Sequence, residues 1–160
     1  HVEEIYKELK TPLRVLDLAQ LPPEIFSPTS YGEKPKSFQP FAEAVLQSSG
    51  LHVVTPEYNG GITPLIANMV SWVSRQKPSP WRHAIFGIGG VSDGKYGTIF
   101  SLSHLRDSLS KVGALVVPTL LGVGPYPDVF DADGAPNEPS IKWKVGQMVR
   151  ELTHFSRGGI

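Results

Sequence analysis

The chain of 160 residues contains no cysteine, so disulfide bonds, thiolate zinc sites and a thiol nucleophile are all excluded. It also has no surplus of either charge, because 15 basic side chains balance 15 acidic ones. Nucleic-acid-binding domains normally carry a basic surplus. No apolar run approaches the ~20 residues that a membrane-spanning helix needs, and no signal-peptide pattern opens the chain. We therefore expect a cytoplasmic protein with no nucleic-acid or membrane partner.

Two kinds of catalytic site have little support in the sequence. No serine lies in the G-x-S-x-G elbow of a hydrolase, and Ser101 and His104 stand one helical turn apart, which is the wrong setting for an exposed nucleophile. No H-x-x-x-H pattern or carboxylate cluster indicates a metal site. The sequence therefore predicts no catalytic side chain of these types and no metal.

The glycine-rich segment 89–96, GGVSDGKY, partly matches a phosphate-binding loop. Gly89, Gly94 and Lys95 have the spacing of that motif, but Tyr96 stands where the motif needs a hydroxyl for magnesium. A nucleoside triphosphatase is therefore disfavoured. Two interpretations stay open: a turn that uses the backbone freedom of glycine, or a loop whose bare backbone lies close to a flat ligand.

Short apolar runs alternate with amphipathic segments along the chain. The apolar runs predict strands at 13–18, 51–55, 83–90 and 114–121. Helical spacing predicts helices at 1–10, 41–49, 64–75, 98–112 and 139–155. The segment 19–40 is rich in Pro, Ser, Lys and Gly and predicts a long surface loop. This alternation is typical of a single α/β domain over 1–160 with a doubly wound parallel sheet and helices on both faces.

The segment 55–64, TPEYNGGITP, joins a predicted strand to a predicted helix and contains more than turn residues. Pro56 stiffens the chain, and residues 59–61 tolerate positive φ, so a sharp turn can present N–H groups outward. Tyr58 offers a ring face at low entropic cost. On spacing alone two interpretations are equal: a wall for a planar ligand, or a Tyr58 that packs on a helix and a Glu57 that makes a salt bridge.

Residues 55–75, TPEYNGGITPLIANMVSWVSR, resemble the signature of the NADPH-dependent FMN reductase family, which includes quinone, azo-dye and chromate reductases. The matching positions are Pro56, Glu57, Tyr58, Asn59, Asn68 and Trp72. Downstream, 85–94 and 102–118 resemble the family's glycine-bearing strand, its next helix with a Leu-Arg pair and the strand after it. The segment 129–134, VFDADG, resembles its acidic turn before the last helix. The match covers about residues 50–152.

The resemblance implies a flavodoxin-like fold with FMN at the carboxyl edge of the sheet. It implies an oxidoreductase that passes a hydride from NADPH or NADH through FMN to a quinone, free flavin or similar acceptor by a ping-pong route. The cofactor-binding positions that it implies are Pro56, Glu57, Tyr58, Asn59, Gly60, Gly89 and Gly90. A homodimer or homotetramer is also implied, with Trp72 and Trp81 as candidates for either the interface or the core. Arg75, Lys77, Arg82 and Lys95 are available near the expected mouth of the site for the extra phosphate of NADPH, but a solvated face explains them equally well.

One departure from the family pattern concerns the start of the chain. The family's first strand and phosphate loop have no counterpart before the helix predicted at 1–10, so we expect roughly 20 to 30 further residues in the natural protein. No residue for the FMN phosphate can be named. The alternatives are a non-enzymatic flavodoxin-like binding module and an electron carrier, although carrier flavodoxins are usually strongly acidic and this chain is neutral.

Overall fold

A parallel sheet of three strands forms the centre of the molecule. The computed structural model describes residues 1–21, 24–30, 32, 35–82 and 84–157. The strands are β1 (Gly50–Val54), β2 (Ile85–Val91) and β3 (Leu115–Val123), and they lie in the order β1-β2-β3. A helix joins each neighbouring pair, as parallel pairing requires. The predicted α/β architecture is therefore confirmed. His83, which opens the predicted strand 83–90, lies outside the described residues, as do 22–23, 31 and 33–34 of the predicted loop 19–40.

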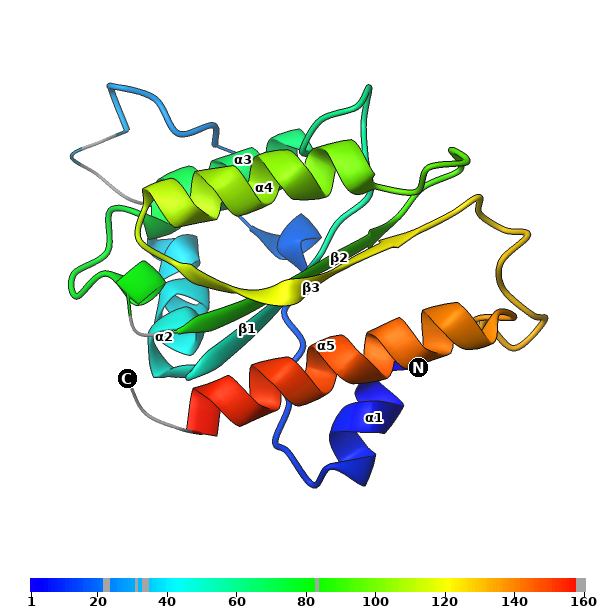
Figure 1. Cartoon of the computed structure of the whole chain (residues 1–160). Coiled ribbons are helices and arrows are strands. Elements are labelled where there is room, and N and C mark those ends of the chain that lie inside the picture. Colours follow the sequence, from blue (N-terminus) through cyan, green and yellow to red (C-terminus); the bar gives the residue numbers. More distant parts are fainter. Residues whose placement is uncertain (22–23, 31, 33–34, 83, 158–160) are drawn as a thin grey trace.

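Helices cover both faces of the sheet (Figure 1). The helices are α1 (Val2–Glu8), α2 (Gln39–Gln47), α3 (Pro64–Val73), α4 (Ile99–Lys111) and α5 (Pro139–Arg157). Three short 3-10 helices are η1 (Leu18–Gln20), η2 (Lys36–Phe38) and η3 (Pro80–Arg82). In Figure 1, α3 and α4 lie above the sheet, and α5 with α1 lies below it. Within the described part of the chain, every helix is too short or too polar to cross a bilayer.

Each face of the sheet has its own hydrophobic core. Phe86 and Ile88 of β2 pack with α2, α3 and α4, whereas Ile85 packs with α1 and α5. This period of two buries both faces of β2, which explains why its sequence is an unbroken apolar run. Trp72 and Trp81 are 0% and 2% exposed, so both belong to the first core. The interface role considered for these two tryptophans is therefore wrong.

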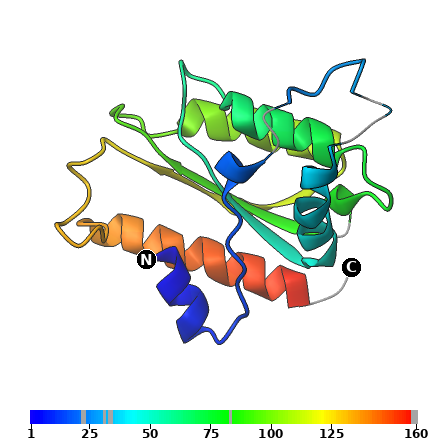
Figure 2. The ribbon, with the colours of Figure 1, turned by 180° about the vertical axis from the view of Figure 1, so that it is seen from behind.

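The strand predicted at 13–18 is not formed. Residues 12–17 have no regular structure, and Leu18 begins η1, where the Asp17 side chain accepts a hydrogen bond from the backbone N–H of Ala19 at 2.9 Å. Leu13 and Val15 are 43% and 67% exposed. The apolar alternation is real, but a strand also needs a neighbour, and a cavity separates this segment from β1. Seen from behind, the segment crosses from the α5 side toward the α3 side (Figure 2).

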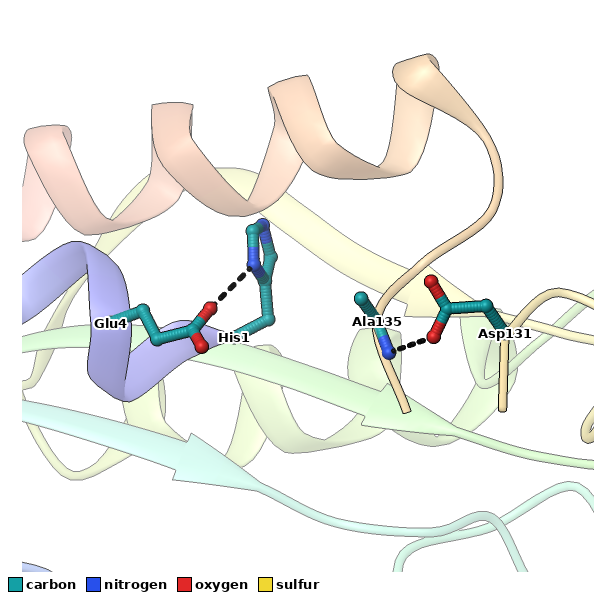
Figure 3. Close-up of polar contacts among 4 residues, drawn as sticks. All are labelled: His1, Glu4, Asp131 and Ala135. Carbon is teal, nitrogen blue, oxygen red and sulfur yellow. Dashed lines mark hydrogen bonds and ion pairs between the residues drawn. The ribbon is translucent and has the colours of Figure 1, made fainter. Parts of the chain in front are cut away.

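The acidic turn before α5 is closed by its first aspartate. The Asp131 carboxylate accepts hydrogen bonds from the backbone N–H groups of Asp133 at 3.1 Å and Ala135 at 2.8 Å. Figure 3 shows the second of these bonds together with the contact between His1 and Glu4 at the start of α1. The carboxylate satisfies turn N–H groups that would otherwise need water, so this turn has a local structural explanation.

Glu151 of α5 holds the middle of β3. Its carboxylate accepts hydrogen bonds from the Thr119 backbone N–H at 3.1 Å, the Thr119 hydroxyl at 2.9 Å and the Gln147 amide at 2.9 Å. Partial desolvation acts to raise the pKa of Glu151, but the bonds from Gln147 and Thr119 outweigh it and lower this pKa below its ordinary 4.5. The pairing register of β2 and β3 shifts next to Thr119, between Phe86 and Ile88. At this irregularity the Thr119 N–H donates to Glu151.

We expect Glu151→Gln to lower the free energy of unfolding by about 1 kcal/mol at neutral pH, because it weakens three bonds to a partly exposed carboxylate. A lowered folded-state pKa contributes stability above the unfolded pKa, and this contribution is lost as the pH falls through the folded value. The difference between variant and wild type should therefore shrink as the pH falls below 4.5. Urea unfolding at neutral and at acidic pH measures it, and an unchanged difference would contradict the ionic role of Glu151.

Candidate functional site

The two loops singled out from the sequence leave neighbouring strands at the same edge of the sheet. Val54 is in register with Gly89, and the Thr55 N–H donates to the Gly89 carbonyl at 3.0 Å. The chain that follows β1 therefore emerges beside the chain that follows β2. This is the carboxyl edge, where parallel α/β sheets bind their ligands.

The chain after β1 forms a tight two-residue hairpin. Tyr58 and Gly61 exchange backbone hydrogen bonds of 3.2 and 2.9 Å, and the residues between them, Asn59 and Gly60, have φ of 52° and 72°. Asn-Gly is the pair that such a turn favours. Of the three residues expected to tolerate positive φ, Asn59 and Gly60 adopt it.

This turn presents polar backbone and an aromatic ring outward. Among the described residues, the N–H groups of Asn59 and Gly60 have no hydrogen-bond partner. A Cβ atom added at Gly60 would meet nothing within 4 Å, and the Tyr58 side chain is 59% exposed. The ring therefore does not pack on a helix, contrary to one of the two interpretations of this segment.

Glu57 has a partner that the sequence did not indicate. Its Oε2 accepts a hydrogen bond of 2.9 Å from the backbone N–H of Ser101, in the first turn of α4. The carboxylate therefore points at the helix terminus and makes no salt bridge within the described part of the chain. The two residues are 44 positions apart, so no local pattern could reveal the pair.

Gly89 and Gly90 lie inside β2, in keeping with the strand predicted at 83–90, and not in the loop considered for the segment 89–96. Both are buried. A Cβ atom at Gly90 would overlap the Thr55 carbonyl oxygen and lie 2.9 Å from the Thr98 hydroxyl, and one at Gly89 would lie 3.2 Å from the Cβ of Leu121. The pair therefore lets β1, β3 and the start of α4 approach β2 closely.

The exposed part of the second segment begins after β2. Ser92 fixes the start of this segment through its backbone, whose N–H donates to the Val123 carbonyl and whose carbonyl accepts from the Tyr126 N–H. The Ser92 hydroxyl also donates to the Gly97 carbonyl at 2.8 Å. Residues 93–96 between these anchors are exposed, with Tyr96 at 74%. This short loop, and not the glycine pair itself, faces solvent at the edge of the sheet where the Tyr58–Gly61 turn also lies.

The candidate cations do not gather at this edge. Arg75, Lys77 and Arg82 follow the C-terminal end of α3 and precede β2, so they lie at the opposite, amino edge of the sheet. A Cβ atom at Gly113, in the other connection at that edge, would touch the Arg82 side chain at 3.4 Å. Their proposed place at the mouth of the site is wrong, and of the four only Lys95 lies at the carboxyl edge.

Asn68 and Trp72, the later positions of the motif, hold a distant loop. The Asn68 side chain accepts from the Phe26 N–H at 2.8 Å and donates to the Glu24 carbonyl at 3.1 Å, and the Trp72 indole N–H donates to that carbonyl at 3.2 Å. The Phe26 ring packs edge-on against Trp72 at 5.1 Å. These two side chains fasten the loop to α3.

A cavity of about 800 Å³ lies away from this site, along the outer edge of β1 and under the segment 11–16. His52 lines it, and burial lowers the pKa of His52 to about 4. The Tyr6 hydroxyl lies 3.4 Å from His52 Nδ1, and burial raises the pKa of Tyr6 to about 12. Both groups are therefore uncharged at neutral pH and suit a structural role.

Known proteins share both the sequence pattern and the fold. The family model for NADPH-dependent FMN reductase matches residues 1–127. The chain belongs to this family. It is 32% identical over 96 residues to 2-hydroxy-1,4-benzoquinone reductase of a Burkholderia species, covering 57% of this chain and 49% of that protein. It is 28% identical over 125 residues to the NAD(P)H-dependent FMN reductase of Pseudomonas aeruginosa, covering 77% of this chain and 67% of that protein.

The solved structure of FerB from Paracoccus denitrificans, described as a flavoenzyme NAD(P)H:(acceptor) oxidoreductase, superposes with a TM-score of 0.80 at 19% identity. That alignment covers 99% of this chain and 87% of FerB, and it confirms the expected flavodoxin-like fold. The chain spans about half the length of the Burkholderia relative and two thirds of the Pseudomonas one.

Proposed function

We propose that the protein is an FMN-dependent oxidoreductase that passes a hydride from NADPH or NADH to a quinone, free flavin or similar acceptor. The observation that carries this proposal is the Tyr58–Gly61 turn, which offers two N–H groups and an exposed ring at the carboxyl edge of a sheet in this family. Two relatives, a 2-hydroxy-1,4-benzoquinone reductase and an NAD(P)H-dependent FMN reductase, support the same chemistry.

The residues at this edge fit the ring system of FMN. A flavin edge carries carbonyl oxygens and ring nitrogens, and the N–H groups of Asn59 and Gly60 are donors without another partner in the described structure. The Tyr58 ring offers a face for stacking. The Glu57 carboxylate is bonded to the Ser101 N–H at the start of α4, so we assign it no contact with the ring. We assign no residue to the phosphate.

Bound FMN would supply the hydride chemistry, and the protein would bind and orient it. The N–H groups of Asn59 and Gly60 would donate to ring atoms that gain negative charge on reduction, as preorganised donors do elsewhere. No side chain is assigned to move a proton. Use of one ligand face by both the nicotinamide nucleotide and the acceptor gives ping-pong kinetics, and we propose a homodimer or homotetramer in keeping with the family resemblance.

The test is a titration of the whole chain with FMN, followed by NADPH without oxygen. We expect the flavin spectrum to shift on binding and to bleach with NADPH. Tyr58→Ala should raise the Kd for FMN by roughly 3- to 10-fold, because one aromatic contact is lost. Phe155→Ala is the matched control, since Phe155 is 44% exposed near the C-terminal end of α5, at the amino edge of the sheet.

Two results would contradict the proposal. A chain that leaves the flavin spectrum unchanged would favour the non-enzymatic binding module. A chain that binds FMN but is never reduced by NADPH or NADH, and passes single electrons between proteins, would favour the carrier. Equal Kd values for wild type and Tyr58→Ala would remove Tyr58 from the site.

A further inference from the structure

We propose that Glu57 is a positioning residue that fastens the Tyr58–Gly61 turn to the N-terminus of α4 and does not touch the flavin. The functional part of this inference rests on the proposed function, because the turn is the surface assigned to FMN. The inference deepens it by separating the residues that would contact the ligand from the one that sets their position.

The N-terminus of α4 lacks the cap that its own sequence could supply. Thr98 occupies the cap position but makes no side-chain capping bond, and its buried hydroxyl has no partner. The Ser101 N–H is one of the donors that a helix leaves unsatisfied at its start, and the Glu57 carboxylate satisfies it at 2.9 Å. A carboxylate is also favoured there by the positive end of the helix dipole. Glu57 therefore caps the N-terminus of α4 from a loop that is distant in the sequence.

The other end of the same loop caps a second helix. The Thr63 hydroxyl accepts from the Ile66 N–H at 3.3 Å, in the first turn of α3, and it lies 3.4 Å from the Thr55 hydroxyl across the base of the loop. The loop from 55 to 63 is thus tied to α3 at its end and to α4 near its start. Only the turn between the two ties projects freely.

This arrangement fixes the turn before any ligand arrives. A surface held in its binding geometry loses less entropy on binding than a mobile one. The same bond explains why a carboxylate stands at position 57. The Glu57 charge is directed at the N-terminus of α4 and not at the proposed flavin site. We therefore assign Glu57 to positioning the turn, and Tyr58, Asn59 and Gly60 to contact with FMN.

Hydrogen exchange of the ligand-free chain tests the tie directly. In Glu57→Ala we expect the hydrogen-bonded amides of Ser101, Tyr58 and Gly61 to exchange roughly 10-fold faster, because a charge-assisted hydrogen bond that holds the turn is lost. The Kd for FMN should rise by a similar, roughly 10-fold, factor. Glu57→Gln keeps an oxygen that can accept from Ser101 and should restore both quantities to within roughly 3-fold of wild type. Asp107→Asn, which removes an exposed carboxylate paired with Arg106 on the same helix, should change neither.

The outcomes separate this inference from the proposed function. If Glu57→Ala raises the Kd for FMN while ligand-free exchange stays at the wild-type rate, Glu57 contacts the ligand and the inference is overturned. Unchanged exchange and unchanged Kd would overturn it as well. Wild-type protein that fails to bind FMN would sink the proposed function, whereas the exchange rates would still decide whether Glu57 holds the turn. Circular dichroism confirms that each variant is folded.

Discussion

Gly90→Ala is expected to lower the free energy of unfolding by about 3 kcal/mol, the upper end of the cost of overpacking a buried site. The new methyl group would overlap the backbone carbonyl of Thr55 and approach the Thr98 hydroxyl at 2.9 Å. Neither neighbour yields easily, because the Thr55 N–H is bonded to β2 and Thr98 is the N-cap residue of α4. Urea unfolding followed by circular dichroism measures the loss.

Two other glycines at the same edge serve as controls for Gly90. A Cβ atom at Gly94 would meet only the Ser92 hydroxyl at 3.6 Å, so Gly94→Ala should stay within about 0.5 kcal/mol of wild type. Gly60 has open space but a φ of 72°, so its alanine variant should cost about 1 kcal/mol through backbone strain alone. If Gly90→Ala kept wild-type stability and lost only FMN binding, the glycine would face the ligand after all.

The strands and crossover helices were predictable because the sequence repeats a simple rule. A strand with helices on both faces of its sheet reads as a short apolar run, and LHVV, IFGIGG and LVVPTLL supply such runs at β1, β2 and β3, although only β2 is buried almost throughout. The start of α3 was predictable too, because Thr63 caps it and Pro64 follows at its first position. These signals are local, so the sequence displays them directly.

The mistaken predictions depended on contacts between distant segments. The segment 13–18 has a strand-like pattern, but no pattern reports whether a partner strand lies alongside it. Gly89 and Gly90 belonged both to the strand predicted at 83–90 and to the glycine-rich segment 89–96, and only the packing of Thr55 and Thr98 shows why they lie in β2. The bond from Ser101 to Glu57 likewise joins residues that the fold, not the sequence order, brings together.

Trp72→Ala is expected to cost about 3 to 5 kcal/mol, as truncations of a fully buried large aromatic do. The indole is 0% exposed, packs edge-on against Phe26 and lies with its ring centre 5.8 Å from that of Phe38. Its removal would leave a cavity in the core above the sheet and release one of the bonds that hold the loop at Glu24. Trp143→Ala is the matched control, because Trp143 is 62% exposed on α5 and should change stability by less than about 0.5 kcal/mol.

Trp72→Phe separates packing from hydrogen bonding at the same position. The phenyl ring fills most of the space, and the Glu24 carbonyl keeps its bond from Asn68 at 3.1 Å, so the cost should be about 1 kcal/mol. If Trp72 acts only through the core, the folded fraction of each variant should bind FMN with the wild-type Kd. A folded Trp72→Phe protein with weakened FMN binding would show that this motif position also shapes the ligand site.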